Sequence, residues 1–221
     1  MTDALQIYFA GDIFDHKDLV GNALLARYIE QSSAGRYRCV LPQNLEQSSN
    51  RAVNIRNQDL VQVIQCDVAL FNFDGDDLDS GTVVEFMLAK MLDIPALIVR
   101  SDFRSAGDQN KDGDDWNLMC SFFPRARNFQ FNAMAWFQAA HADGDDILET
   151  LPKLYLSLSE QITAALDEVC DEPSLFGGDL NRARALYDWA RQFPGSGLAH
   201  RIDDQALEQI VQRKHARGML K

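Results

Sequence analysis

The stretch that decides the fold of this chain is VALFNFDGDDLDSGTVVEFMLAKML, residues 68–92. It begins with an apolar run that is typical of a buried strand. An acidic turn follows, and the next apolar segment has the length of a helix that Asp79 or Ser80 can cap. Glu85 is the only charged residue between positions 82 and 89. A lone carboxylate in such a segment costs stability unless it is paired or used, so Glu85 is a candidate functional residue.

Strands and helices alternate through the first two thirds of the chain. We predict strands at residues 5–10, 37–41, 67–73, 95–99 and 128–131 and helices at residues 17–31, 50–65 and 80–92. This alternation predicts a parallel sheet with right-handed crossovers. The expected fold is therefore an α/β, flavodoxin-like (Rossmann-like) three-layer sandwich over residues 1–146.

The rest of the chain has a helical pattern only. Residues 147–169 form a long amphipathic repeat, and residues 180–193 and 202–214 form two shorter ones. We predict a C-terminal helical extension over residues 147–221. Its helices can pack on the core or form a surface for a partner, and the pattern leaves both open.

Composition and charge limit the classes of partner. The formal net charge of −12 argues against a nucleic-acid partner, which needs a basic surface. No apolar run approaches the ~20 residues that a membrane span requires, and the first residues lack the basic region of a signal peptide. The four cysteines include no CxxC pair, so we expect free thiols and a cytoplasmic protein.

One acidic segment resembles a metal site. Asp108, Asn110, Asp112 and Gly113 match the first half of a calcium-binding loop, but the twelfth position holds Met119 where the loop needs a glutamate. We therefore expect this segment to be a solvated acidic loop and not a calcium site. There is no GxGxxG or GxxxxGK[ST] motif either. We therefore expect no metal and no cofactor.

Asp79, Gly81 and Glu85 form the motif Asp-x-Gly-x-x-x-Glu at the start of a predicted helix. Tyr8 lies in the first predicted strand, and Asp59 lies in the helix before the motif. In type, spacing and order these residues resemble the nucleoside 2-deoxyribosyltransferase family. The resemblance extends over most of the predicted α/β domain and implies an enzyme of nucleoside salvage.

The resemblance also implies roles. Glu85 would attack the anomeric carbon and form a covalent glycosyl-enzyme in a retaining double displacement. The Tyr8 hydroxyl would donate a hydrogen bond to Glu85. Asp59 and Asp79 would hold the sugar hydroxyls or the base, and one of them would help protonate the departing base. Gly81 would let the backbone approach the substrate closely.

Three further residues follow from the resemblance alone. Gln43, just after the second predicted strand, lies where family members recognise the base. Asn117 and Met119 match an Asn-Leu-Met segment that in some members reaches into a neighbouring subunit's site. We therefore expect a homodimer or higher homo-oligomer, with small-molecule nucleosides and nucleobases as partners.

Two alternatives remain open. Relatives that hydrolyse nucleoside 5′-monophosphates carry serine where this chain has Asp79, and a carboxylate there favours a free 5′-hydroxyl over a phosphate. Water could still replace the acceptor base, which would make the protein an N-glycoside hydrolase of nucleosides or nucleoside 5′-monophosphates. A non-enzymatic nucleotide-binding or interaction module would keep the pocket but would not need Glu85.

Overall fold

The structure is a computed structural model that describes residues 4–45, 51–105, 107–109, 113–141, 144 and 146–221. Its centre is a sheet of five parallel strands: β1 (Leu5–Ala10), β2 (Tyr37–Val40), β3 (Val68–Asn72), β4 (Ala96–Arg100) and β5 (Ala126–Gln130). Their order is β2-β1-β3-β4-β5, which is the flavodoxin-like order. The predicted α/β fold is confirmed, and each strand lies within two residues of its predicted position.

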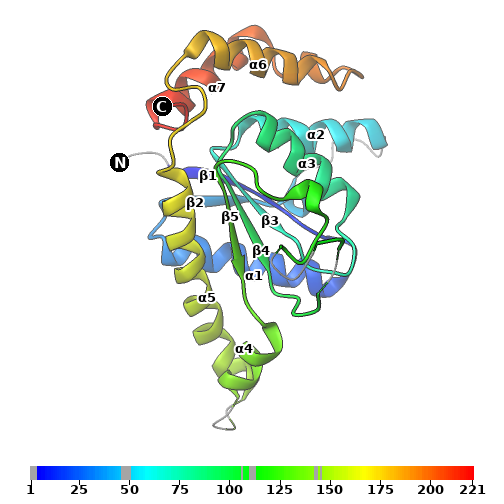
Figure 1. Cartoon of the computed structure of the whole chain (residues 1–221), viewed down its shortest axis with the longest axis vertical. Coiled ribbons are helices and arrows are strands. Elements are labelled where there is room, and N and C mark those ends of the chain that lie inside the picture. Colours follow the sequence, from blue (N-terminus) through cyan, green and yellow to red (C-terminus); the bar gives the residue numbers. More distant parts are fainter. Residues whose placement is uncertain (1–3, 46–50, 106, 110–112, 142–143, 145) are drawn as a thin grey trace.

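Two layers of helices cover the sheet (Figure 1). The helices α1 (His16–Ser32) and α5 (Ile147–Cys170) lie on one face, and α2 (Ala52–Gln65) and α3 (Ser80–Met91) lie on the other. Successive strand residues point to opposite faces. Ile7 accordingly packs with α1 and α5, whereas Tyr8 packs with α2 and α3. The side chains of β1 thus alternate between the two helix layers, and Tyr8 faces the layer formed by α2 and α3.

One helix was not predicted. The short α4 (Ala133–Ala140) follows β5, and the Asn132 side chain caps its first turn by accepting from Ala135 N at 2.9 Å. Eight residues are too few for a clear helical repeat in the sequence. Trp136 on α4 packs against Phe131 and Tyr155, which ties α4 to the α1–α5 layer.

The C-terminal helices occupy two places. We placed a boundary at residue 146, and α5, the first helix beyond it, fills the same layer as α1. The helices α6 (Leu180–Gln192) and α7 (Asp204–Ala216) lie outside α2 and α3 (Figure 1). Tyr187 of α6 is fully buried there and donates to Leu92 O at 3.3 Å. The hydrophobic core therefore continues into the extension.

Buried polar contacts tie the end of the chain to the amino ends of the strands. Arg125 Nη1, just before β5, donates to the Asp93 carboxylate at 2.9 Å and to Met219 O at 3.1 Å. Asp93 also accepts from Ser174 Oγ at 2.7 Å. The side chains of Arg125 and Asp93 are both nearly inaccessible to solvent. These contacts hold the extension at the edge of the sheet opposite to the strand carboxyl ends.

A second set of contacts covers the start of β3. The guanidinium of Arg217, just after α7, pairs with the fully buried Asp67. The ammonium of Lys214 donates to Cys66 O. The chain's end thus lies away from the strand carboxyl ends, where parallel α/β proteins bind their ligands. Among the described residues, none of the helices combines the length and apolar character needed to cross a membrane.

We expect Arg125→Ala to lower the free energy of unfolding by about 3–5 kcal/mol, because it leaves the Asp93 carboxylate buried without its cation. The matched control is Arg127→Ala, two residues away, whose half-exposed guanidinium pairs with Glu168 and Glu172 and whose loss is expected to cost less than about 1 kcal/mol. Urea unfolding followed by circular dichroism measures both. Equal losses for the two variants would contradict the anchoring role of Arg125.

Candidate active site

The two central strands carry the candidate site. β1 and β3 are neighbours in the sheet. The helix that follows β1 covers one face and the helix that follows β3 covers the other, so this is the point where the strand order reverses. Ligands of such folds bind outside the strand carboxyl ends at this point. Here the Tyr8 hydroxyl, from β1, donates a 2.7 Å hydrogen bond to Glu85 Oε1, from α3. The structure thus brings together two residues that are 77 positions apart.

Glu85 lies in an environment that opposes its charge. Its pKa is raised from 4.5 to about 7: burial is the largest cause, the Tyr8 hydrogen bond opposes it, and the carboxylates of Asp59 and Asp79 add to it. The dipole of α3 favours an ionised carboxylate near the start of the helix. Burial outweighs that effect, because Glu85 is the sixth residue of α3 and the dipole acts mainly within the first turn.

Tyr8 and Asp59 complete a buried group of titrating side chains. Burial, followed by the charges of Glu85 and Asp59, raises the pKa of Tyr8 well above its ordinary value, so its hydroxyl stays a hydrogen-bond donor. Burial also raises the pKa of Asp59 from 3.8 to about 6. Two neighbouring carboxyl groups therefore change protonation close to neutral pH, which suits acid–base chemistry.

Asp79 has a structural contact of its own. Its Oδ2 atom caps α3 by accepting from Thr82 N at 2.7 Å and from Thr82 Oγ1 at 2.9 Å. A Cβ atom at Gly81 would lie 3.0 Å from Asp79 Oδ2, so a side chain at this position would crowd the cap. The second carboxylate oxygen of Asp79 has no hydrogen-bond donor among the described residues, so it is available to a ligand.

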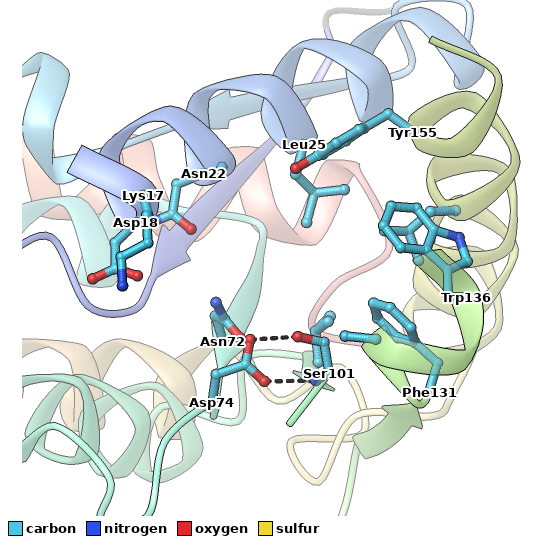
Figure 2. A pocket seen from close by; sticks show the side chains of 14 residues that line it. Lys17, Asp18, Asn22, Leu25, Asn72, Asp74, Ser101, Phe131, Trp136 and Tyr155 are labelled. Carbon is cyan, nitrogen blue, oxygen red and sulfur yellow. Dashed lines mark hydrogen bonds between the residues drawn. The ribbon is translucent and has the colours of Figure 1, made fainter. Parts of the chain in front are cut away.

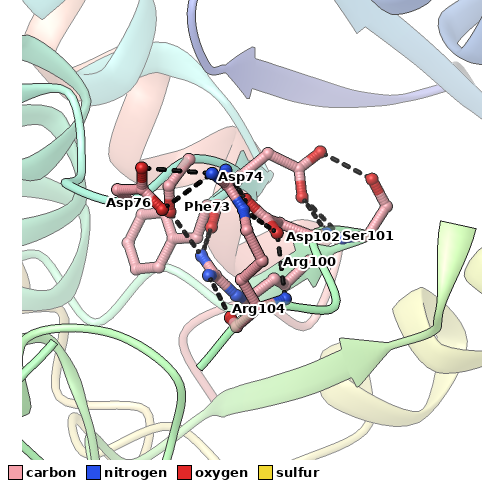
Figure 3. A network of polar contacts seen from close by, with 8 residues as sticks. Phe73, Asp74, Asp76, Arg100, Ser101, Asp102 and Arg104 are labelled. Atoms are coloured by element: carbon pink, nitrogen blue, oxygen red, sulfur yellow. Dashed lines mark hydrogen bonds and ion pairs between the residues drawn. The ribbon is translucent and has the colours of Figure 1, made fainter. Parts of the chain in front are cut away.

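A network of polar contacts holds the acidic turn that leads from β3 into α3 (Figure 3). The Asp74 carboxylate accepts from Ser101 N at 2.6 Å, from Ser101 Oγ at 2.8 Å and from Asp102 N at 2.8 Å. Arg100 is almost fully buried, and its guanidinium donates to Phe73 O, Gly75 O and Arg104 O. The end of β4 thereby fixes the turn that carries Asp79. No sequence pattern predicted this role of Arg100 and Asp74.

Asp12 is a further residue that the sequence analysis missed. It follows Gly11 at the carboxyl end of β1. Burial, and then the nearby Asp79 carboxylate, raise its pKa. Its place directly after a central strand was the available signal. With Asp59, Asp79 and Glu85 it makes the mouth of the site strongly acidic.

Three predicted residues lie apart from this group. Gln43 donates to Leu19 O at 2.7 Å, and its Oε1 atom is buried without a partner in the described part of the chain. Asn117 and Met119 line a separate cavity of about 580 Å³ with Ser80 and Val83 of α3. Both are exposed, Met119 by 68%. Within one chain they do not join the Tyr8–Glu85 pair.

The structure describes only part of the calcium-like segment. Its positions Asn110 and Asp112 lie outside the described residues. Asp108, which is described, accepts from Leu118 N at 2.9 Å. Within the described ranges no group of three or more histidine, cysteine, aspartate or glutamate side chains is arranged to hold a metal ion.

A sequence model of the nucleoside 2-deoxyribosyltransferase family matches residues 7–128, more than half of the chain. The chain belongs to this family. The match includes Tyr8, Asp59, Asp79 and Glu85. The protein is therefore an enzyme of the nucleoside deoxyribosyltransferase type, as the sequence analysis predicted.

Solved structures resemble the chain more distantly. A conserved protein from Enterococcus faecalis V583 is 21% identical, with a TM-score of 0.46, over 75% of this chain and 98% of that one. A 2-desoxiribosyltransferase from Leishmania mexicana is 22% identical, with a TM-score of 0.45, over 62% of this chain and 99% of that one. A 2-deoxyribosyltransferase from Bacillus psychrosaccharolyticus is 14% identical, with a TM-score of 0.42, over 66% and 95%. A search of curated proteins finds no match.

The raised pKa of Glu85 predicts a pH-dependent cost in stability. Glu85 keeps its proton to about pH 7 when folded but only to about 4.5 when unfolded. Between these values the unfolded chain binds fewer protons, so the free energy of unfolding falls as pH rises. We expect Glu85→Gln to match the wild type at pH 4 and to exceed it by on the order of 2–3 kcal/mol at pH 8.

The measurement is urea unfolding of both proteins across this pH range. Glu160→Gln, at an exposed position of α5, is the control and should follow the wild type throughout. A constant difference between Glu85→Gln and the wild type at all pH values would contradict the titration of Glu85.

Proposed function

We propose that the protein transfers a 2′-deoxyribosyl group from a nucleoside to a second nucleobase, with Glu85 as the nucleophile. The observation that carries the proposal is the 2.7 Å hydrogen bond from the Tyr8 hydroxyl to Glu85. It holds a half-buried carboxylate at the strand carboxyl ends and favours its ionised form. The family to which the chain belongs supports the same chemistry.

In the first half of the reaction, a Glu85 carboxylate oxygen attacks C1′ of the deoxyribose. The C1′–N bond breaks, and its electron pair leaves with the base. The base needs a proton as it departs, and we assign that proton to Asp59, since its pKa of about 6 leaves part of the population protonated near neutral pH. The products of this half are the free base and a deoxyribosyl ester of Glu85.

In the second half, a ring nitrogen of another base attacks C1′ and displaces the Glu85 carboxylate. The proton that this nitrogen loses returns to Asp59. Two displacements at one carbon retain its configuration. Water in place of the second base would give free deoxyribose, so the hydrolase alternative uses the same first half.

The charge around the site favours nucleosides over nucleotides. The Asp79 carboxylate lies close enough to Asp12 to raise its pKa. Both carboxylates would repel a 5′-phosphate. The free oxygen of Asp79 can instead accept from a 5′-hydroxyl. Gln43 Oε1, which is buried without a partner among the described residues, is our candidate for the base contact.

We also propose that the active enzyme is a homo-oligomer in which one chain supplies Asn117 and Met119 to another. The support is an apolar surface on α3 and the segment around the short helix η2 (Leu118–Cys120). It contains exposed apolar side chains: Val84, Met87, Leu118, Met119 and Phe122. Phe122 is 83% exposed and has a φ of +64°, which costs energy in a non-glycine residue. A second copy of the chain would cover this surface.

A product assay tests the proposed activity. With deoxyinosine and free adenine, we expect deoxyadenosine and hypoxanthine, resolved by chromatography. Hypoxanthine without deoxyadenosine would mean that water is the acceptor. If no nucleoside or nucleotide gave a product, the chain would be a binding module.

Two variants test the roles proposed for Glu85 and Tyr8. We expect Glu85→Ala to lower kcat by about a thousandfold or more, with an unchanged circular dichroism spectrum. Tyr8→Phe should lower kcat about 10- to 100-fold through loss of one hydrogen bond to a charged group. It should also shift the acid limb of the pH profile upward, because that bond lowers the pKa of Glu85. Turnover that survives Glu85→Ala would remove Glu85 as the nucleophile.

Light scattering after size exclusion tests the assembly. We expect a dimer or larger for the wild type and dissociation in Phe122→Asp and Met87→Asp, with lost activity. Phe193→Asp, which alters an exposed aromatic residue just after the distant α6, is the matched control. A monomeric wild type with full activity would contradict this arrangement.

A further inference from the structure

A second cavity lies at the carboxyl edge of the sheet, on the α1–α5 face (Figure 2). Its volume is about 200 Å³. Asn72 and Asp74 border it from the end of β3, Lys17 and Asp18 from the start of α1, and Trp136 from α4. None of the residues assigned to the reaction lines it.

The end of β3 separates this cavity from the Tyr8–Glu85 pair. Phe71 belongs to the core under α2 and α3, as Tyr8 does, so the next residue, Asn72, points to the opposite face. Gly11 packs so closely against it that a Cβ atom on Gly11 would lie 2.9 Å from the Asn72 Cβ. The two sites are therefore adjacent but distinct.

The cavity contains a polar group that the protein leaves unpaired. Asn72 Oδ1 is buried without a hydrogen-bond partner, and no hydrogen bond to the amide nitrogen is formed by the described residues. A buried amide in this state costs about 1–3 kcal/mol. Because nothing holds the amide, it can turn to present either its donor or its acceptor. The Tyr155 hydroxyl, at the same cavity, also makes no hydrogen bond within the described part of the chain.

One wall of the cavity is aromatic. The Trp136 ring packs edge-on against Phe131 at 5.8 Å and against Tyr155 at 6.0 Å between centroids. These contacts fix the Trp136 ring, and a planar ligand can pack against such a wall. The volume is below the range of about 300–1,000 Å³ for drug-sized sites, which suits a single heterocycle better than a whole nucleoside.

The rim of the cavity selects against anions. Asp18 and Asp74 border it, and burial together with the nearby Asp15 and Asp74 carboxylates raises the pKa of Asp18. Lys17 is the one cation among the lining residues, and it pairs with Asp15 at 3.3 Å. A ligand with N–H donors is favoured here, and a phosphate is not.

We infer that this cavity binds a free aminopurine-type base, with its ring against Trp136 and its amino edge on the Asn72 amide. An asparagine amide pairs through two hydrogen bonds with the adjacent amino donor and ring-nitrogen acceptor of adenine. The base here is held and not transferred, because Glu85 is not among the residues that line this cavity. The site thus differs in place and in chemistry from the reaction site.

Gly21 offers a clean way to block the cavity. It lines the cavity from α1, and a Cβ atom on it would meet only the Tyr155 hydroxyl, at 4.0 Å. Gly21→Ala is therefore tolerated, and in a helix it stabilises by about 1 kcal/mol. Gly21→Met extends three more heavy atoms into the space. The pair differs only in whether the cavity is filled.

The test is equilibrium dialysis of radiolabelled adenine against the wild type, Gly21→Ala and Gly21→Met. We expect Gly21→Met to bind one equivalent fewer than the other two while it keeps the transfer activity. This difference does not depend on whether adenine also occupies the reaction site. Failure of the proposed transfer would appear in the product assay instead, so the two failures are distinguishable.

Two further measurements fix the contacts. Purine, which lacks the amino group, should bind about tenfold more weakly than adenine. Asn72→Leu, which keeps the side-chain volume without the amide, should also lose tenfold or more in adenine affinity, and it serves as the test if Gly21→Met fails to fold. Equal stoichiometry in Gly21→Ala and Gly21→Met, or unchanged affinity in Asn72→Leu, would overturn the inference.

Discussion

The hydrogen bond between Tyr8 and Glu85 is the constraint around which the molecule is organised. Removal from water destabilises the ionised form of a carboxyl group more than its protonated form. Burial is accordingly the largest cause of the raised pKa of Glu85, about 7. Among the described residues, the Tyr8 hydroxyl is the neighbour that offsets this burial. It reaches Glu85 only because β1 and β3 pair in register and α3 begins directly after the acidic turn. Displacement of any of these elements would break the contact.

The two edges of the sheet differ in their contacts: the amino edge is held by buried ion pairs, and the carboxyl edge carries the candidate active site. At the amino ends, buried charges form ion pairs, as in the contact between Arg125 and Asp93, and the C-terminal helices cover them, although Asp93 Oδ1 and Arg125 Nη2 have no hydrogen-bond partner among the described residues. At the carboxyl ends, several polar groups are buried but unpaired, as in Gln43 and Asn72. Natural proteins leave such groups unpaired chiefly where a ligand, water or ion completes them. The extension thus stabilises the edge that is not used and leaves the other edge open.

In the proposed reaction the acidic groups act on the substrate as well as on each other. Asp12, Asp59 and Asp79 oppose further negative charge at the site, so in that reaction they would disfavour a phosphate. Burial, together with the Asp59 and Asp79 carboxylates, also raises the pKa of Glu85. Asp74 has a structural role as well, because three donors from the end of β4 satisfy its carboxylate. Its oxygen atoms hold the turn in place, and its charge still borders the second cavity.

The sequence by itself predicted the fold, which the structure confirms, and it proposed the central residues. Local apolar periodicity decides where strands and helices lie, and the spacing within Asp79 to Glu85 depends on one helix alone. Tertiary structure alone decided the pKa of Glu85, the hydrogen bonds by which Arg100 and Asp74 hold the acidic turn, and the place of Asp12 beside Asp79. The short α4 and the place of α6 and α7 also required it. Each of these depends on side chains that are far apart in the chain, and burial and distance between such groups leave no local pattern.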